Sequence, residues 1–227
     1  MKSLINTVLL LFVCTLFYSC SDNDNNDDND GQTQSSEFFN LNVGNKWVYK
    51  RYDYNINSGQ FVFSGIVDTV KIVEMVNYQG FTFAKRSSQK VNASNGIDQT
   101  ITYSYLRVNN LGHLVSIDDI FNYGNLNETS GITLHPGKDY DFVYSQVFDY
   151  GSLDYQLYDL TNVTVEGNNY SILPYKGIFT PNPSYPDLVS KVVEFNYEEN
   201  IGLVNNVCHA VSSNYKWEDR LISYQLN

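Results

Sequence analysis

Cysteine is scarce in this sequence, and its three cysteines exclude a disulfide-stabilised fold. Cys14 lies in an apolar N-terminal run and Cys20 follows that run, so Cys208 alone remains for a folded domain. A single thiol cannot form an internal disulfide. Because Cys208 lies in an apolar, strand-like stretch, we expect a buried and unreactive side chain.

Positive charge is also scarce, with 14 Lys and Arg residues against 25 Asp and Glu residues and a net charge of −11. Residues 20–36 hold five of the acidic residues and residues 1–19 hold one basic residue, so residues 37–227 carry 20 acidic and 13 basic residues, a net −7. Proteins that bind a nucleic-acid phosphate backbone need clustered Lys and Arg. The charge therefore argues against nucleic acid as a partner and suits a soluble extracellular domain.

Long hydrophobic runs are absent except near the N-terminus, where residues 4–17 are almost wholly apolar. This run is shorter than the ~20 residues that a membrane-spanning helix requires. With Lys2 before it and Ser19 after it, it has the basic start, apolar centre and small residue of a secretory signal. We expect residues 1–19 to be a signal peptide; an uncleaved anchor helix is the alternative.

The residues around Cys20 resemble a bacterial lipoprotein signal of the Bacteroidota type. Ser19 fits that pattern, whereas Phe17 and Tyr18 depart from it. In such lipoproteins the cysteine is lipidated and begins the mature chain, and an acidic run behind it directs export to the outer cell surface. Residues 21–30 form such a run. The resemblance implies a lipid on Cys20 and a place on the outer membrane, facing the cell exterior.

Residues 21–36 contain no aliphatic or aromatic side chain and therefore cannot form a core. We expect residues 20–36 to act as a flexible, self-repelling tether between the bilayer and the domain. Several acyl chains would hold the protein firmly, because each buried CH₂ contributes about 0.8 kcal/mol.

One pattern in the tether is close to the calcium-binding loop of an EF-hand. It places oxygen-bearing side chains at suitable intervals: Asn26, Asp28, Asp30 and Glu37. An Asp/Asn-rich tract without flanking helices produces such matches easily, so we interpret it as a solvated spacer. We expect neither calcium nor another cofactor.

The remaining sequence shows alternation of apolar and polar residues, rich in Tyr, Phe, Val, Ile and Thr and interrupted by Gly, Asn and Asp. It predicts an all-β antiparallel domain over residues 37–227, built as a sandwich or a curved half-barrel with one solvated face. Residues 118–121 could open a short helical turn. We expect strands at residues 46–54, 60–76, 80–90, 100–108, 114–117, 140–150, 154–166, 170–175, 189–197, 202–211 and 217–226.

An internal repetition suggests two related halves, residues 37–130 and 131–227. The spacing of four residues recurs 93 positions later, with Leu41, Gly44, Trp47 and Tyr49 matching Leu134, Gly137, Tyr140 and Phe142. A chance match of four positions is the alternative.

Residues 42–49, NVGNKWVY, resemble the opening strand of a family of Bacteroidota surface lipoproteins of unknown function. Residues 164–170, 200–204 and 220–224 are similar to later parts of the family's pattern, so the resemblance covers most of the mature chain. It implies a β-rich secreted domain and offers no catalytic residues.

Outside the tether, the sequence gives no specific motif for catalysis or metal binding. The sequence lacks the G-x-S-x-G of a nucleophile elbow. The histidines do not have metal-ligand spacing, and we expect all three at the surface or in turns: His113, His135 and His209. Neighbouring carboxylates occur at residues 118–119, 198–199 and 218–219, but a glycosidase needs two carboxyls about 5–10 Å apart across a cleft. We therefore expect no enzyme.

The best candidate for a ligand-binding loop is residues 175–186, whose three prolines would hold the chain extended and outside the sheet. Tyr175, Phe179 and Tyr185 could offer ring faces to a sugar or a peptide. The alternative is a crossover whose aromatic side chains pack on the core. Thr69 lies in a triplet that resembles the acceptor for O-glycosylation in Bacteroidota.

The sequence favours a surface-anchored lipoprotein that is a non-catalytic binding or structural module. Its partners would be the membrane, through the lipid on Cys20, and glycans or other outer-membrane proteins. Two alternatives stay open. One is a carbohydrate-active hydrolase whose Asp and Glu residues meet only in three dimensions. The other is a carrier of a lipid or hydrophobic ligand, which would need a cavity of at least about 300 Å³.

Overall fold

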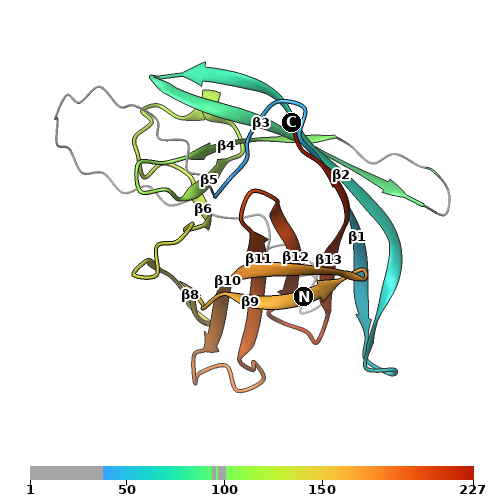
Figure 1. The fold of residues 1–227 in the computed structure, drawn as a ribbon. Helices are drawn as coiled ribbons and strands as arrows, with labels where there is room; N and C mark the ends of the chain where they lie inside the picture. Colours follow the sequence, from blue (N-terminus) through green and yellow to red (C-terminus); the bar gives the residue numbers. More distant parts are fainter. Residues whose placement is uncertain (1–37, 94–95, 97–100) are drawn as a thin grey trace.

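The computed structural model describes residues 38–93, 96 and 101–227 (Figure 1). The predicted lipid site at Cys20 and the calcium-like pattern of Asn26, Asp28, Asp30 and Glu37 lie outside these residues. The described chain forms one antiparallel sheet of 13 strands that curves without closing. This confirms the all-β prediction and shows one continuous sheet where a sandwich would have two. No helix within the described ranges is long and apolar enough to cross a membrane.

The sheet consists of two meanders that meet at its centre. The first runs outward to one edge through β1 (Lys46–Asn55), β2 (Gln60–Tyr78), β3 (Phe81–Asn92), β4 (Thr102–Val108), β5 (Leu114–Ile117) and β6 (Ile132–His135). The second returns from the other edge through β7 (Val143–Phe148), β8 (Gly151–Leu157), β10 (Asn168–Pro181), β11 (Lys191–Glu198), β12 (Gly202–His209) and β13 (Lys216–Gln225). β9 (Thr161–Val165) lies off this path and pairs with β10. β13 pairs with β1, so the first and last strands are neighbours. The proposed division into related halves stays a prediction.

The curvature of the sheet comes from β-bulges in its long central strands. The register between β1 and β2 shifts opposite Gly65, which has a φ of +86° that suits glycine. A second shift lies between Ile72 and Glu74, where β2 pairs with β3. Bulges bend a strand and increase its twist. They turn β2 around the domain, so the sheet has a concave and a convex face (Figure 1).

The opening motif of the domain ties distant strands together across the concave side. The indole Nε1 of Trp47 donates to the carbonyl of Ile201 at 2.6 Å, and the hydroxyl of Tyr49 donates to the carbonyl of Leu203 at 2.9 Å. Asn45 is fully buried and accepts a hydrogen bond from the backbone N–H of Asn227 at 2.7 Å. Asn45, Trp47 and Tyr49 of the motif therefore have structural roles, because each forms a hydrogen bond with a distant part of the chain.

A hairpin of β9 and the first part of β10 folds back over the convex side of the last strands (Figure 1). A buried polar chain runs across β11, β12 and β13: Asn196 donates to Asn205, which donates to Glu218, each at 3.0 Å. Glu166, at the hairpin turn, accepts hydrogen bonds from Tyr52 and Arg220. The contacts of Glu166 fix the hairpin to the sheet, and the polar chain joins β11, β12 and β13 to one another.

Several details differ from the strands expected from the sequence. The expected strand at residues 154–166 is two strands, β8 and β9. Residues 140–150 form β7 and a turn, and β6 was not predicted. β10 continues to Pro181, so residues 175–181 lie inside the sheet and the prolines do not hold them outside it. Pro174 is tolerated because it lies where β10 changes partner from β9 to β8, and its carbonyl still accepts from Tyr158 at 2.8 Å. The short helical turn is confirmed as a 3₁₀ segment, Ile120–Asn122.

The expectation that all histidines are exposed or in turns was wrong for two of them, because each has hydrogen-bond partners in the interior. His113 and His135 are only 1% and 0% exposed. The Nε2 of His113 lies 2.8 Å from a carboxylate oxygen of Asp139. His135 accepts at Nδ1 from the N–H of Gly137 and donates from Nε2 to the carbonyl of Leu173. Cys208 is buried, as predicted.

Candidate ligand cavity

The concave face of the sheet surrounds a cavity of about 550 Å³. Side chains from both meanders line it, including residues of β1, β2, β3, β11 and β13. Small-molecule sites in proteins typically have volumes of about 300–1,000 Å³. The cavity is therefore large enough for a ligand of that class, and the size criterion for a carrier is met.

Aromatic side chains form much of the cavity wall. They are Phe39, Trp47, Tyr49, Tyr144, Tyr155, Tyr175, Phe195, Tyr197 and Trp217. Aliphatic side chains fill the spaces between them, among them Val70, Ile72, Leu106 and Val193. Both tryptophans of the protein are on this wall. Such a surface favours a ligand with a large apolar part.

Charged side chains also line the cavity, and some of them are already paired. Arg51 binds Asp219 through two hydrogen bonds, at 2.8 and 3.0 Å. The hydroxyl of Ser88 lies 2.8 and 2.9 Å from the carboxylate oxygens of Asp68. Lys90 and Asp118 also lie on the cavity lining.

Arg86 and Lys90 differ from the paired groups, because neither forms a hydrogen bond or ion pair with a described residue. Arg86, Ser88 and Lys90 alternate along β3, so they share its concave face. Arg86 is half-buried, and its guanidinium makes no hydrogen bond or ion pair with any residue that the structure describes. Five N–H donors are therefore available to a molecule in the cavity.

Burial keeps several tyrosine hydroxyls of the wall neutral at physiological pH by raising their pKa. Burial raises the pKa of Tyr197 to about 12, against a smaller opposing effect of the Arg86 charge. Burial also raises the pKa of Tyr49 and of Tyr175. The Tyr175 hydroxyl is buried and has no hydrogen-bond partner among the described residues. It can donate to, or accept from, a ligand.

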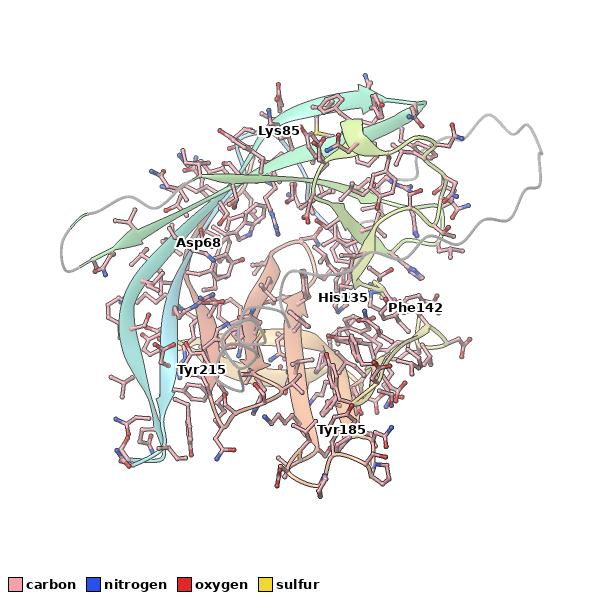
Figure 2. The ribbon with its side chains drawn as sticks, turned by 180° about the vertical axis from the view of Figure 1, so that it is seen from behind. Asp68, Lys85, His135, Phe142, Tyr185 and Tyr215 are labelled. Atoms are coloured by element: carbon pink, nitrogen blue, oxygen red, sulfur yellow. The ribbon has the colours of Figure 1, made fainter. Side chains whose placement is uncertain are left out.

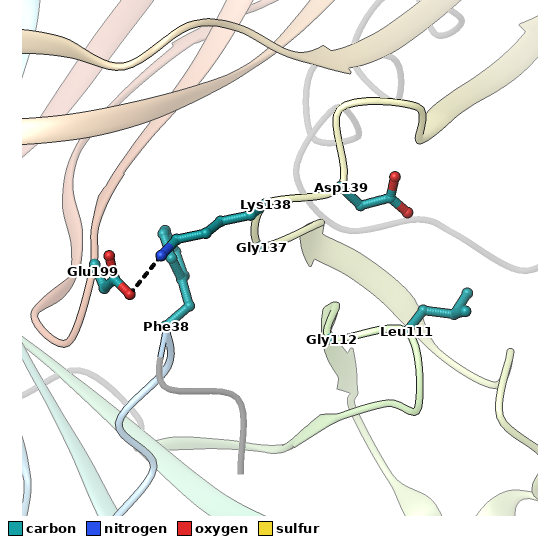
Figure 3. Close-up of a pocket in the computed structure, with 7 residues that line it drawn as sticks. All are labelled: Phe38, Leu111, Gly112, Gly137, Lys138, Asp139 and Glu199. Atoms are coloured by element: carbon teal, nitrogen blue, oxygen red, sulfur yellow. Dashed lines mark hydrogen bonds and ion pairs between the residues drawn. The ribbon is translucent and has the colours of Figure 1, made fainter. Parts of the chain in front are cut away.

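A second, smaller hollow of about 370 Å³ lies beside the turn after β6 (Figure 3). Lys138 crosses it to reach Glu199 at 2.8 Å. Asp139, also on its lining, is bound to His113. Because these charges already have partners, the larger cavity is the better candidate site.

The three aromatic residues proposed for ligand binding do not gather on one surface. Tyr175 and Phe179 are buried in β10, at 2% and 4% exposure, and only Tyr175 lines the cavity. Tyr185 is exposed in the turn after β10, at the far end of these strands from His135 (Figure 2). Thr69 is half-buried on β2, between two cavity-lining residues, so it points to the opposite face. Its glycosylation stays a prediction.

The neighbouring carboxylates occupy separate environments. Glu218 and Asp219 point to opposite faces of β13, where they bind Arg220 and Arg51 respectively. Glu199 binds Lys138. Within the described ranges, no group of three His, Cys, Asp or Glu residues could hold a metal ion.

The sequence reasoning named a carrier cavity only as an alternative, without its lining, and did not identify Arg86. One signal was present: β3 alternates three polar residues, Arg86, Ser88 and Lys90, with Ser87 and Gln89. With polar residues on both faces, the pattern does not indicate which face is concave. That assignment needs the bulges and the pairing of β1 with β13.

Two solved structures have a similar course of the chain. One is a predicted exported protein with a YmcC-like fold from Bacteroides fragilis NCTC 9343, with 10% identity and a TM-score of 0.49. The other is a predicted lipoprotein from Parabacteroides distasonis ATCC 8503, with 12% identity and a TM-score of 0.43. Each likeness covers 83% of this chain and 98% of the other. No family model matches the sequence, and no curated protein matches it.

Proposed function

We propose that this protein is a binding lipoprotein of the outer membrane, which holds a small molecule with a large apolar part in the concave cavity of its sheet. The observation that carries the proposal is the cavity of about 550 Å³ with a largely aromatic wall. A filled interior would leave no room for a carrier function, whereas this one has the size of ordinary ligand sites. The lipid on Cys20 would hold the domain at the bilayer.

Binding, rather than catalysis, is the role that the lining supports best. Asp219 is committed to Arg51, and Asp68 to Ser88. A hydrolase that uses two carboxyls needs one as an acid and the other as a base or nucleophile, both free to reach the same bond. The tyrosines and the aliphatic side chains offer contact area instead.

The protein provides its own reporter of cavity occupation, because Trp47 and Trp217 both line the cavity and the sequence contains no other tryptophan. We expect dodecanoate, added below its micelle concentration to the purified full-length protein, to change tryptophan fluorescence in a saturable way. Val70→Phe would fill part of the cavity and weaken binding. Val62→Phe, on the same strand but 51% exposed, is the matched control and should bind as the wild type does.

A change in tryptophan fluorescence that grows linearly with dodecanoate concentration and does not saturate would contradict the proposal. Equal weakening of binding by Val70→Phe and Val62→Phe would contradict it as well, because only Val70 lies on the cavity wall.

A further inference from the structure

We infer that the ligand of the cavity is an amphipathic anion, whose head group binds the guanidinium of Arg86 and whose apolar part lies along the aromatic wall. This rests on the proposed function and names the class of ligand. The inference comes from which polar groups of the lining have partners and which do not.

The charges of the lining balance in number, so total charge does not decide the sign of the ligand. Three cations, Arg51, Arg86 and Lys90, stand against three anions, Asp68, Asp118 and Asp219. The sign of the ligand is decided by which of these charges already have a partner in the protein. Asp219 receives both hydrogen bonds from Arg51, Asp68 is held by Ser88, and Asp118 is exposed to solvent.

Two cations of the lining, Arg86 and Lys90, have no hydrogen bond or ion pair with a described residue, and of the two Arg86 carries the guanidinium. No hydrogen bond or ion pair joins it to the described residues, although it is half-buried. Asp68 is the anion that β2 contributes to the lining, but it pairs with Lys90 in the ladder, four positions from Ile72, the partner of Arg86, and no ion pair joins Asp68 to Arg86. A guanidinium binds a carboxylate or phosphate through two parallel hydrogen bonds.

A second polar group with no partner supports a ligand in this cavity. The hydroxyl of Tyr175 is buried, lines the cavity and has no hydrogen-bond partner in the described part of the chain. Tyr175 itself is 2% exposed. A buried hydroxyl without a partner is costly, so a ligand atom that pairs with it would be stabilising. The apolar side chains around these groups suit the rest of the molecule.

The test compares ligands that share a 12-carbon chain and differ in head group: dodecanoate, dodecyl phosphate, dodecanol and dodecyltrimethylammonium. Each is titrated into the purified full-length protein, and tryptophan fluorescence and calorimetry give its Kd. We expect at least one of the two anions to bind about 10-fold or more tightly than dodecanol, with the ammonium compound weakest. The stronger anion identifies carboxylate or phosphate as the natural head group.

The substitution Arg86→Gln keeps a polar side chain and removes the charge. It should weaken binding of the preferred anion about 10-fold, which corresponds to about 1.4 kcal/mol, and leave dodecanol unchanged. Lys71→Gln is the matched control, because Lys71 is exposed on β2 and is not on the cavity lining. Lys71→Gln should leave the Kd of the preferred anion and the Kd of dodecanol unchanged.

Two negative results are distinguishable. If none of the four compounds binds, the proposed function fails. If they bind with equal affinity, or if Arg86→Gln weakens anion and alcohol alike, the protein binds apolar chains and the inference about the head group is overturned.

Discussion

Protonation of His135 should destabilise the fold in acid, and the effect can be calculated from its surroundings. The ring is fully buried, and burial lowers its pKa to about 4 from the usual value near 6.5. The hydrogen bond at Nδ1 acts in the same direction, whereas the one from Nε2 to the carbonyl of Leu173 raises the pKa and offsets part of the effect. Nδ1 accepts from Gly137, so a proton there would face an N–H donor and break that bond. The folded state therefore holds His135 neutral.

The direction of the pH effect follows from the pKa of His135 in the folded chain and its pKa in the unfolded chain. Above pH 6.5 His135 is neutral in the folded and the unfolded chain, so the stability is fully present. As the pH falls towards 4, only the unfolded chain takes up the proton, and stability is lost. With 1.36 kcal/mol for each unit of pKa, the loss is about 1.4 kcal/mol at pH 5.5 and about 2.5 kcal/mol at pH 4.5.

Urea unfolding between pH 7.5 and pH 4.5, followed by circular dichroism, gives the free energy of unfolding at each pH. His135→Phe removes the titrating group, so the difference between wild type and variant should shrink by these amounts as the pH falls. His209→Gln is the comparison variant, because it removes a different histidine. His209 is half-buried, and burial lowers its pKa as well. An unchanged pH dependence in His135→Phe would refute the reasoning.

Three further predictions concern single contacts. Trp47→Phe removes the 2.6 Å hydrogen bond to Ile201 and leaves that carbonyl without its donor, so we expect a loss of about 1–3 kcal/mol in urea unfolding; an unchanged midpoint would contradict the role given to the motif. Gly177→Val should cost about 1–3 kcal/mol, because a Cβ there would lie 2.5 Å from the Tyr155 ring, and wild-type stability would show that the ring moves freely. Cys20→Ala should move the protein out of the detergent phase in a phase-partitioning assay, whereas retention there would contradict lipidation.

Much of the fold could be predicted because strands with one buried face have a local signature. The alternation around Tyr49, Tyr52 and Tyr54 indicated β1, and the runs that became β2, β3 and β12 began within about one residue of the observed strands. β6 was missed because Ile132–His135 has only four residues and ends in a buried histidine. Pro174 suggested an end to β10, since the sequence does not show that a strand changes partner there.

The site could not be predicted in the same way, because it depends on contacts between residues far apart in the sequence. Arg86 alternates with other polar residues, and its face becomes concave through the bulges of β2, at Gly65 and between Ile72 and Glu74. Tyr175 was selected as a ligand-binding residue, but for an exposed loop, whereas it lies in a buried strand and faces the cavity. The residue type of Tyr175 indicated a ligand contact, whereas its surroundings depend on the pairing of strands that are far apart in the sequence.

Photochemical labelling would test the central claim most directly. A dodecanoate analogue with a diazirine at the end of its chain would be bound to the full-length protein, irradiated, and its attachment sites mapped by peptide mass spectrometry. We predict labels on cavity-lining residues of β1, β3 and β11, suppressed by excess dodecanoate. Labels confined to the convex face, or labels that dodecanoate does not suppress, would contradict a ligand held inside the curve of the sheet.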